Sequence, residues 1–193
     1  MPNWCENTLE VYGEEEEMNK FYEFFGGTEN FEKNFNFNNI IEMPRVLEET
    51  TSPVRIISEE DYDKLQELRE KYTLELNSSG KNVWDLFNDK KISEEERELM
   101  FQNGITQEIS DRLKSLYGSD NWYTWANNNW GTKWDIDGDD GIVNDLDTHN
   151  CSLTFSTAWS PPEPIINKLR EMFPNLEFSG MYVGEGYEFA DVF

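Results

Sequence analysis

The sequence predicts an α+β protein in which helices cover one face of an antiparallel sheet. Three observations lead to this prediction. Apolar and polar residues alternate at both ends of the chain, helical periodicity follows directly after these stretches, and a mostly helical region lies between them. A period of two residues is typical of strands and a period of 3.6 of helices, so the two kinds of element can be told apart.

The N-terminal part predicts a strand followed by a helix. The strand is expected over residues 3–12, where Cys5 and Leu9 fall on the same face. The helix is expected over residues 14–25, with four glutamates in its first turn, where the helix dipole favours anions. Phe and Asn alternate over residues 30–39, which we expect to be extended or irregular.

The middle of the chain is expected to form a helical insertion over residues 46–118. Ser58 with Asp61, and Ser93 with Glu96, have the spacing of helix N-termini, and the second pair predicts a capping box. A third helix follows and ends at a glycine. No motif in this region points to a chemical activity.

The C-terminal part predicts a second run of strands around one helix. Residues 131–136 are expected to begin a strand, and residues 134–147 to form an acidic loop rich in turns. Residues 151–156 alternate as a half-buried strand does. Ser160 is expected to cap the helix, with Pro161 at its first position and Glu163 completing a capping box. Two further strands are expected to follow this helix.

The expected order is strand, helix, insertion, two strands, helix and two strands. Without the insertion, this is the split β-α-β pattern of a ferredoxin-like sheet. We therefore expect a single domain over residues 1–193 with a ferredoxin-like antiparallel sheet and helices on one face. Residues 1–45 and 119–193 are expected to form the sheet core, and residues 46–118 the mostly helical insertion.

The charge of the chain restricts its partners. Forty acidic residues against 16 basic ones give a net charge of −24. Phosphate backbones and anionic membranes repel such a surface, because nucleic-acid binding depends on Lys and Arg displacing counterions. The charge therefore favours a basic protein or a cationic ligand as the partner, unless it serves only to keep the protein in solution.

Several classes of protein are disfavoured by what the sequence lacks. Cys5 and Cys151 are too few for a disulfide scaffold, and we expect both to be buried thiols. His149 is the single histidine, and contact with Cys151 two residues later on the same strand face is possible, although a surface histidine is the favoured interpretation. No nucleotide-binding or nucleophile motif is present. We assign no catalytic residue and no cofactor, and a non-enzyme is favoured.

The targeting signals of secreted and membrane proteins are also missing from the sequence. The N-terminus has neither a basic region nor an apolar stretch, so it does not resemble a signal peptide. No apolar run approaches the roughly 18 residues of a membrane span. We expect a cytoplasmic protein without membrane contact.

Four tryptophans form the first candidate site. Trp122, Trp125, Trp130 and Trp134 lie within thirteen positions and could form a ligand platform, because aromatic faces stack on bases and sugars. A platform for nucleic acid also needs basic residues, and only Lys133 is near. Packing in the core or between domains is the favoured interpretation of these four side chains.

Four aspartates form the second candidate site. Asp135, Asp137, Asp139 and Asp140 suggest a calcium loop counted from Asp135. The glycine required at position 6 of such a loop is replaced by Asp140, and the glutamate required at position 12 by Leu146. The EF-hand pattern fails at both positions. A cation site of another kind is the remaining alternative to a solvated acidic turn.

Three segments of unusual composition carry a family resemblance. MPNWCENTLEVYG at residues 1–13, NNNWGTKWD at 127–135 and FSTAWSPPEPIINKL at 155–169 resemble the YubB-like proteins of phages and plasmids, in the same order. The resemblance covers about half of the chain and leaves the helical middle unmatched. It implies a ferredoxin-like C-terminal domain and an origin on a phage, a plasmid or an integrated element. It implies no activity and no catalytic residue.

Three functional hypotheses follow. The first is a phage- or plasmid-type accessory protein, a non-enzymatic acidic module that binds a basic host protein and interferes with it by presenting carboxylates in place of phosphates. The second is a module that binds a small ligand or a metal through residues 122–147. The third is an enzyme whose site the sequence does not reveal.

Overall fold

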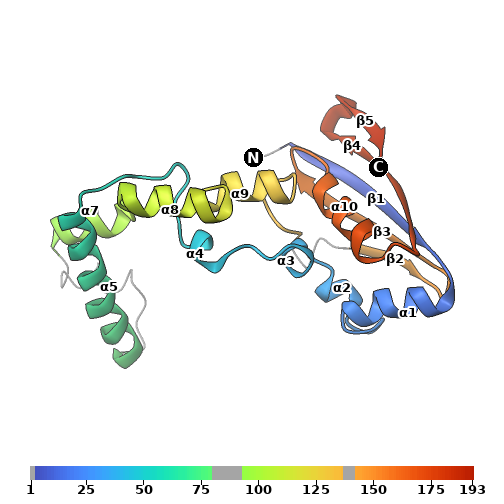
Figure 1. Ribbon diagram of the computed structural model, residues 1–193, viewed down its shortest axis with the longest axis horizontal. Helices are drawn as coiled ribbons and strands as arrows, with labels where there is room; N and C mark the ends of the chain where they lie inside the picture. Colours follow the sequence, from blue (N-terminus) through green and yellow to red (C-terminus); the bar gives the residue numbers. More distant parts are fainter. Residues whose placement is uncertain (1–2, 80–92, 137–141) are drawn as a thin grey trace. The chain divides into compact units, whose positions relative to one another are not determined.

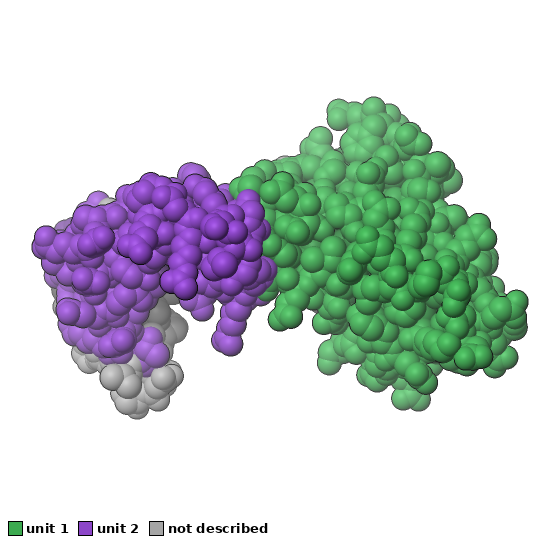
Figure 2. Space-filling view, in the orientation of Figure 1, with its two compact units in different colours: residues 1–43, 123–193 green, residues 44–122 purple. Residues whose placement is uncertain are grey.

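The computed structural model describes residues 3–79, 93–136 and 142–193. Two compact units make up the chain (Figure 2). The sheet unit contains residues 1–43 and 123–193, and the helical unit contains residues 44–122.

The sheet unit contains a five-stranded antiparallel sheet in the order β2-β3-β1-β4-β5. The central strand β1 pairs along its length with β3 on one side and with β4 on the other. The order of the first four strands is that of a ferredoxin-like fold, so the predicted α+β class and topology are confirmed. The strands are β1 Trp4–Tyr12, β2 Ile142–Leu146, β3 Asn150–Ala158, β4 Glu177–Gly184 and β5 Ala190–Val192.

Two helices, α1 (Glu15–Phe24) and α10 (Glu163–Met172), lie on the same face of the sheet (Figure 1). Every second residue of β1 points into this core, and Cys5 and Leu9 are completely buried, as predicted. On the opposite face of β1 the side chains are exposed or half-buried. The sheet therefore has one covered face and one face that carries polar and charged side chains.

Aromatic rings form much of the core beneath the helices. Phe21 is completely buried, and its ring lies 5.2 Å from that of Phe173 and 5.9 Å from that of Phe178. Residues 30–39, expected to be extended or irregular, instead contain the single-turn helices α2 (Phe31–Asn34) and α3 (Phe37–Ile40). Burial of the phenylalanine that begins each turn favours this local structure over an extended chain.

Two expectations for the C-terminal part are wrong. Residues 131–136 form bends rather than a strand, and the second strand of the fold is β2, inside the stretch expected to be an acidic loop. Ser160 does not cap α10, which begins at Glu163 after Pro162. The Ser160 hydroxyl instead donates to the carbonyl of Gly131 at 2.6 Å. A long-range hydrogen bond thus uses the hydroxyl group that the local sequence pattern assigns to the helix cap.

Two helices of the helical unit pack around a small apolar cluster. Leu68 and Tyr72 are buried there, and Leu99 and Met100 pack against them. The capping box of Ser93 and Glu96 is present, as predicted. None of the helices in the described part of the chain is both long and apolar enough for a membrane span. The helices of this unit are α4 Arg45–Glu48, α5 Glu59–Ser79, α7 Glu94–Gln102 and α8 Gln107–Tyr117, whereas α9 Trp122–Asn129 belongs to the sheet unit apart from its first residue.

Candidate binding surface

The four tryptophans singled out by the sequence have different environments. Trp125 and Trp130 are each only 5% exposed, and their rings meet edge to face at 5.5 Å in the sheet unit. The indole of Trp130 donates to the carbonyl of Ile41 at 2.8 Å. These two side chains belong to the core. Trp122 is half-buried in the helical unit, and Trp134 is 39% exposed on the surface of the sheet unit.

Asp135 holds the backbone of another segment in place. One carboxylate oxygen accepts from the amides of Phe37 at 2.6 Å and Ile136 at 2.7 Å, and the other accepts from Asn38 at 3.0 Å. Burial raises the pKa of Asp135, while these three hydrogen bonds act in the opposite direction. Both oxygens are therefore engaged at the start of α3. The other three candidate ligands, Asp137, Asp139 and Asp140, lie outside the described residues.

No metal-binding cluster is formed by the part of the chain that the structure describes. Within residues 3–79, 93–136 and 142–193, no three His, Cys, Asp or Glu side chains are grouped so that they could hold an ion. The candidate cation site at the aspartate-rich loop therefore stays a prediction.

The three segments of unusual composition come together at one end of the sheet unit. The hydroxyl of Thr132 donates to the carbonyl of Ala158 at 2.9 Å, and the Ser160 hydroxyl donates to the carbonyl of Gly131. The amide of Trp159 donates to the carbonyl of Asn3 at 2.9 Å. Hydrogen bonds thus join segments that are far apart in the sequence.

A surface that we call the aromatic edge forms where these segments meet. It consists of Trp4, Lys133, Trp134 and Trp159, and the three tryptophans are 39–42% exposed. The rings of Trp4 and Trp134 lie 6.3 Å apart. The ammonium group of Lys133 lies 4.1 Å from the ring centre of Trp134 and 5.1 Å from that of Trp159. Each of the three segments contributes at least one of these side chains.

A buried polar network supports the aromatic edge. Asn7 is completely buried in β1, and its amide group donates to the carbonyls of Cys5 at 2.9 Å and Phe155 at 3.2 Å. It also donates to the hydroxyl of Thr157 at 2.9 Å. A fully satisfied buried network of this kind fixes the relative positions of β1 and β3. The exposed aromatic side chains are therefore held on a rigid base.

A groove of about 540 Å³ lies beside the aromatic edge, where β1 begins and β4 ends. Trp4, Glu6 and Tyr187 line it, and Tyr187 is 89% exposed in the turn after β4. Glu185, also in the lining, accepts a hydrogen bond from the backbone amide of Trp4 at 3.1 Å. Aromatic faces and carboxylates therefore surround one open space.

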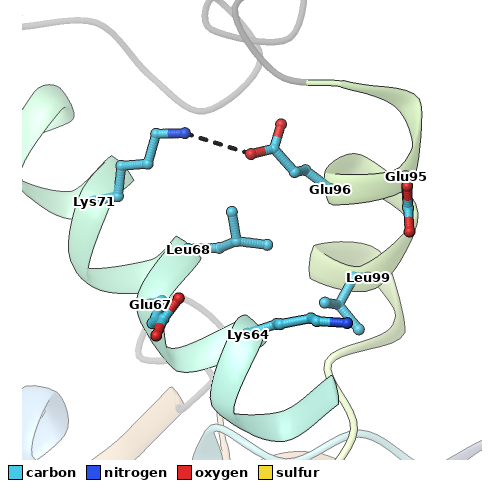
Figure 3. A pocket seen from close by; sticks show the side chains of 7 residues that line it. All are labelled: Lys64, Glu67, Leu68, Lys71, Glu95, Glu96 and Leu99. Carbon is cyan, nitrogen blue, oxygen red and sulfur yellow. Dashed lines mark hydrogen bonds and ion pairs between the residues drawn. The ribbon is translucent and has the colours of Figure 1, made fainter. Parts of the chain in front are cut away.

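A second cavity, of about 330 Å³, lies in the helical unit between α5 and α7 (Figure 3). Leu68 and Leu99 contribute its apolar side chains, and the ammonium group of Lys71 lies 3.4 Å from the carboxylate of Glu96. Hydrogen bonds from Ser93 at the start of α7 lower the pKa of Glu96. The carboxylate is thus engaged in helix capping and an ion pair, and the cavity has the features of a helix-packing seam.

The thiol that the sequence places near a histidine is poorly suited to act as a nucleophile. Cys151 is buried, and burial raises its pKa to about 12, so it is a neutral thiol at physiological pH. His149 is exposed at the turn before β3. Both cysteines are buried and free, as predicted.

Sequence reasoning missed Trp4 and Trp159 as members of a surface. Their partner Trp134 was singled out only because it lies near other tryptophans in the sequence. Both missed residues lie in segments of unusual composition, which is the signal that could have identified them.

Comparison with known proteins gives one match. Residues 129–190 are similar to a family described as the ferredoxin-like domain in Api92-like protein. The match covers about a third of the chain and includes β2, β3, α10 and β4, while the central strand β1 lies outside it. The expected similarity to a ferredoxin-like family is therefore confirmed for the C-terminal part. No curated protein and no solved structure matches the chain.

Proposed function

We propose that this chain is a non-enzymatic accessory protein of a phage or plasmid, of the YubB-like kind, that binds a basic host protein in the cytoplasm. It binds that partner through the aromatic edge and interferes with it, without contacting nucleic acid or a membrane directly. The observation that carries the proposal is the meeting of three compositionally unusual segments on a strongly acidic unit.

Charge supports this choice of partner. The sheet unit contains more than half of the 40 acidic residues but only five of the 16 basic ones. A negative field of this size attracts basic proteins and speeds their association, and it repels phosphate backbones. The exposed tryptophans supply the apolar contact that such an interface needs, because aromatic side chains are enriched where binding energy is concentrated.

Affinity capture from a bacterial lysate tests the proposal. The tagged full-length chain is used as bait at about 50 mM and then about 500 mM salt, conditions that separate electrostatic from apolar binding. A captured protein that is basic, leaves at high salt and loses its nucleic acid on binding supports the proposal. Recovery of no basic protein at low salt contradicts it.

The groove favours a second candidate function, the binding of a small ligand. Its volume of about 540 Å³ lies within the range of ligand pockets, and aromatic side chains line it. A bound ligand raises the melting temperature by mass action. A thermal-shift panel of nucleotides, calcium and quaternary ammonium compounds tests this candidate, and an unchanged melting temperature throughout argues against it.

A further inference from the structure

The groove beside the aromatic edge combines two kinds of group that recognise cations. Trp4 and Tyr187 offer exposed aromatic rings, whose faces attract positive charge. Glu6 and Glu185 lie in the same lining and are both exposed to solvent. We infer that this groove holds arginine side chains of a basic partner protein, an inference that rests on the proposed function.

The chain itself shows that the adjoining aromatic faces hold a cation. The ammonium group of Lys133 lies over the rings of Trp134 and Trp159, at 4.1 Å and 5.1 Å from their centres. Trp4 lies next to Trp134, with a centroid distance of 6.3 Å. The row of rings therefore continues from a place where a lysine is bound to the open groove, and the lining that the structure describes for this groove contains no lysine or arginine.

The two carboxylates are oriented in advance and keep acceptor capacity. Glu185 uses one oxygen to accept from the Trp4 amide, and Glu6 uses one oxygen to accept from the hydroxyl of Ser156 at 2.7 Å. A carboxylate has about four acceptor sites, so each retains sites for another donor. The hydrogen bonds reduce the entropy lost when a ligand is bound.

Arginine fits this arrangement better than lysine. The guanidinium group is planar, stacks on aromatic rings and offers donors in a fork that matches a carboxylate, whereas an ammonium group is a compact and strongly hydrated point charge. Phosphate groups are disfavoured by the same two carboxylates. The ligand expected in this groove is therefore a protein and not a nucleic acid.

Four of the five basic residues of the sheet unit are engaged elsewhere. Lys20 and Lys168 form ion pairs with glutamates of their own helices, and Arg170 donates to the carbonyl of Phe178 at 2.9 Å. Lys133 lies over the tryptophan rings. The field around the groove thus comes mainly from acidic residues, which is complementary to an arginine-rich segment.

Titration calorimetry of the full-length chain with an octa-arginine peptide tests the inference. We expect Tyr187→Ala to weaken binding about threefold, from the loss of an exposed cation–π contact. Glu185→Gln is expected to weaken it by a similar factor, because an exposed ion pair contributes little to affinity, while glutamine still accepts from the Trp4 amide. The double variant should lose about tenfold, and octa-lysine should bind several-fold more weakly than octa-arginine.

Matched controls separate the groove from the charge of the whole unit. Glu23→Gln removes the same charge from an exposed position on α1, and Tyr12→Ala removes an exposed ring from the other end of β1. Both should leave the affinity nearly unchanged. If groove and control variants weaken salt-sensitive binding equally, the groove inference is wrong and the proposed function stands. If the wild-type chain does not bind octa-arginine at low salt, both are wrong.

Nuclear magnetic resonance of the labelled chain localises the peptide. We expect octa-arginine to shift the Trp4 indole signal and the amides of Glu185 and Gly186, and a twelve-residue thymidine oligonucleotide to shift none of them. Shifts confined to α5 and α7 would contradict the inference, and so would shifts of the groove signals by the oligonucleotide.

Discussion

The contacts that stabilise the sheet unit internally differ in kind from those that stabilise the helical unit internally. In the sheet unit, strands far apart in the sequence pair along their full lengths over completely buried aromatic rings. In the helical unit, the contacts include a capping box at the start of α7 and a small cluster around Leu68 and Tyr72. The first kind of contact brings side chains from three distant segments into one surface at the end of the sheet unit. The candidate binding surface accordingly lies on the sheet unit.

Removing an aromatic ring from the centre of the sheet unit's core should give the largest loss of stability. Phe21 lies within 6.0 Å, between ring centres, of five other aromatic rings and is completely buried. Phe21→Ala should lower the free energy of unfolding by about 3–5 kcal/mol, measured by urea denaturation with tryptophan fluorescence. Leu116→Ala, at a position 61% exposed in the helical unit, serves as the control and should change it by less than about 0.5 kcal/mol. A loss below about 1 kcal/mol for Phe21→Ala would contradict this description of the core.

Two glycines with positive φ allow a matched test of the segment that carries Lys133 and Trp134. Gly131 has φ +80, and an added Cβ would lie 2.7 Å from Pro164 Cδ. Gly118 in the helical unit has φ +73 with open space around it. Gly118→Ala should cost about 1 kcal/mol from backbone strain alone, and Gly131→Ala about 3 kcal/mol because overpacking is added. Equal costs in thermal unfolding would show that the 131–134 segment is not packed as described.

A substitution in the cluster of the helical unit should act locally. Leu68→Ala removes a side chain that is 9% exposed and should cost about 2 kcal/mol. Hydrogen exchange should become faster in α5 and α7 while the amides of β1 keep their protection. Equal loss of protection in β1 would show that the two units unfold together.

The smallest effect is expected at the N-terminus of α7. Ser93→Ala removes the capping hydroxyl and should cost about 1 kcal/mol at neutral pH. Hydrogen bonds from Ser93 lower the pKa of Glu96 below its ordinary 4.5. The stabilisation by this carboxylate is therefore complete above pH 4.5 and is lost as the pH falls through the lowered folded-state pKa. Urea denaturation from pH 7 to pH 3 should show the wild type and Glu96→Gln converging in stability at acid pH, whereas a constant difference between these two would contradict the role of the carboxylate.

Local patterns in the sequence were sufficient to predict most helices and strands of the fold. The alternation around Leu9 predicted β1, and the Ser93 and Glu96 pair predicted the start of α7, because each signal depends on neighbours in the sequence. Ser160 was assigned to a helix cap in error, because its hydroxyl is used by Gly131, 29 residues away. The strand expected at residues 131–136 failed for the same reason, since Thr132 and Asp135 bond to distant backbone.

The candidate surface was only partly predictable. Trp134 was singled out together with three other tryptophans, two of which are core residues. Its actual neighbours are Trp4, 130 positions away in the sequence, and Lys133, which also lies over Trp159. No periodicity reveals such contacts, because they arise only when β1 is placed between β3 and β4.

Hydrogen exchange of the full-length chain, with and without a saturating arginine-rich protein at low salt, tests the central claim most directly. The claim is that partner recognition lies on the sheet unit, at the aromatic edge and its groove. We expect added protection at residues 3–6, 131–134 and 184–189 and none in α5 or α7. Protection confined to α5 and α7, or none at any position, would contradict the claim.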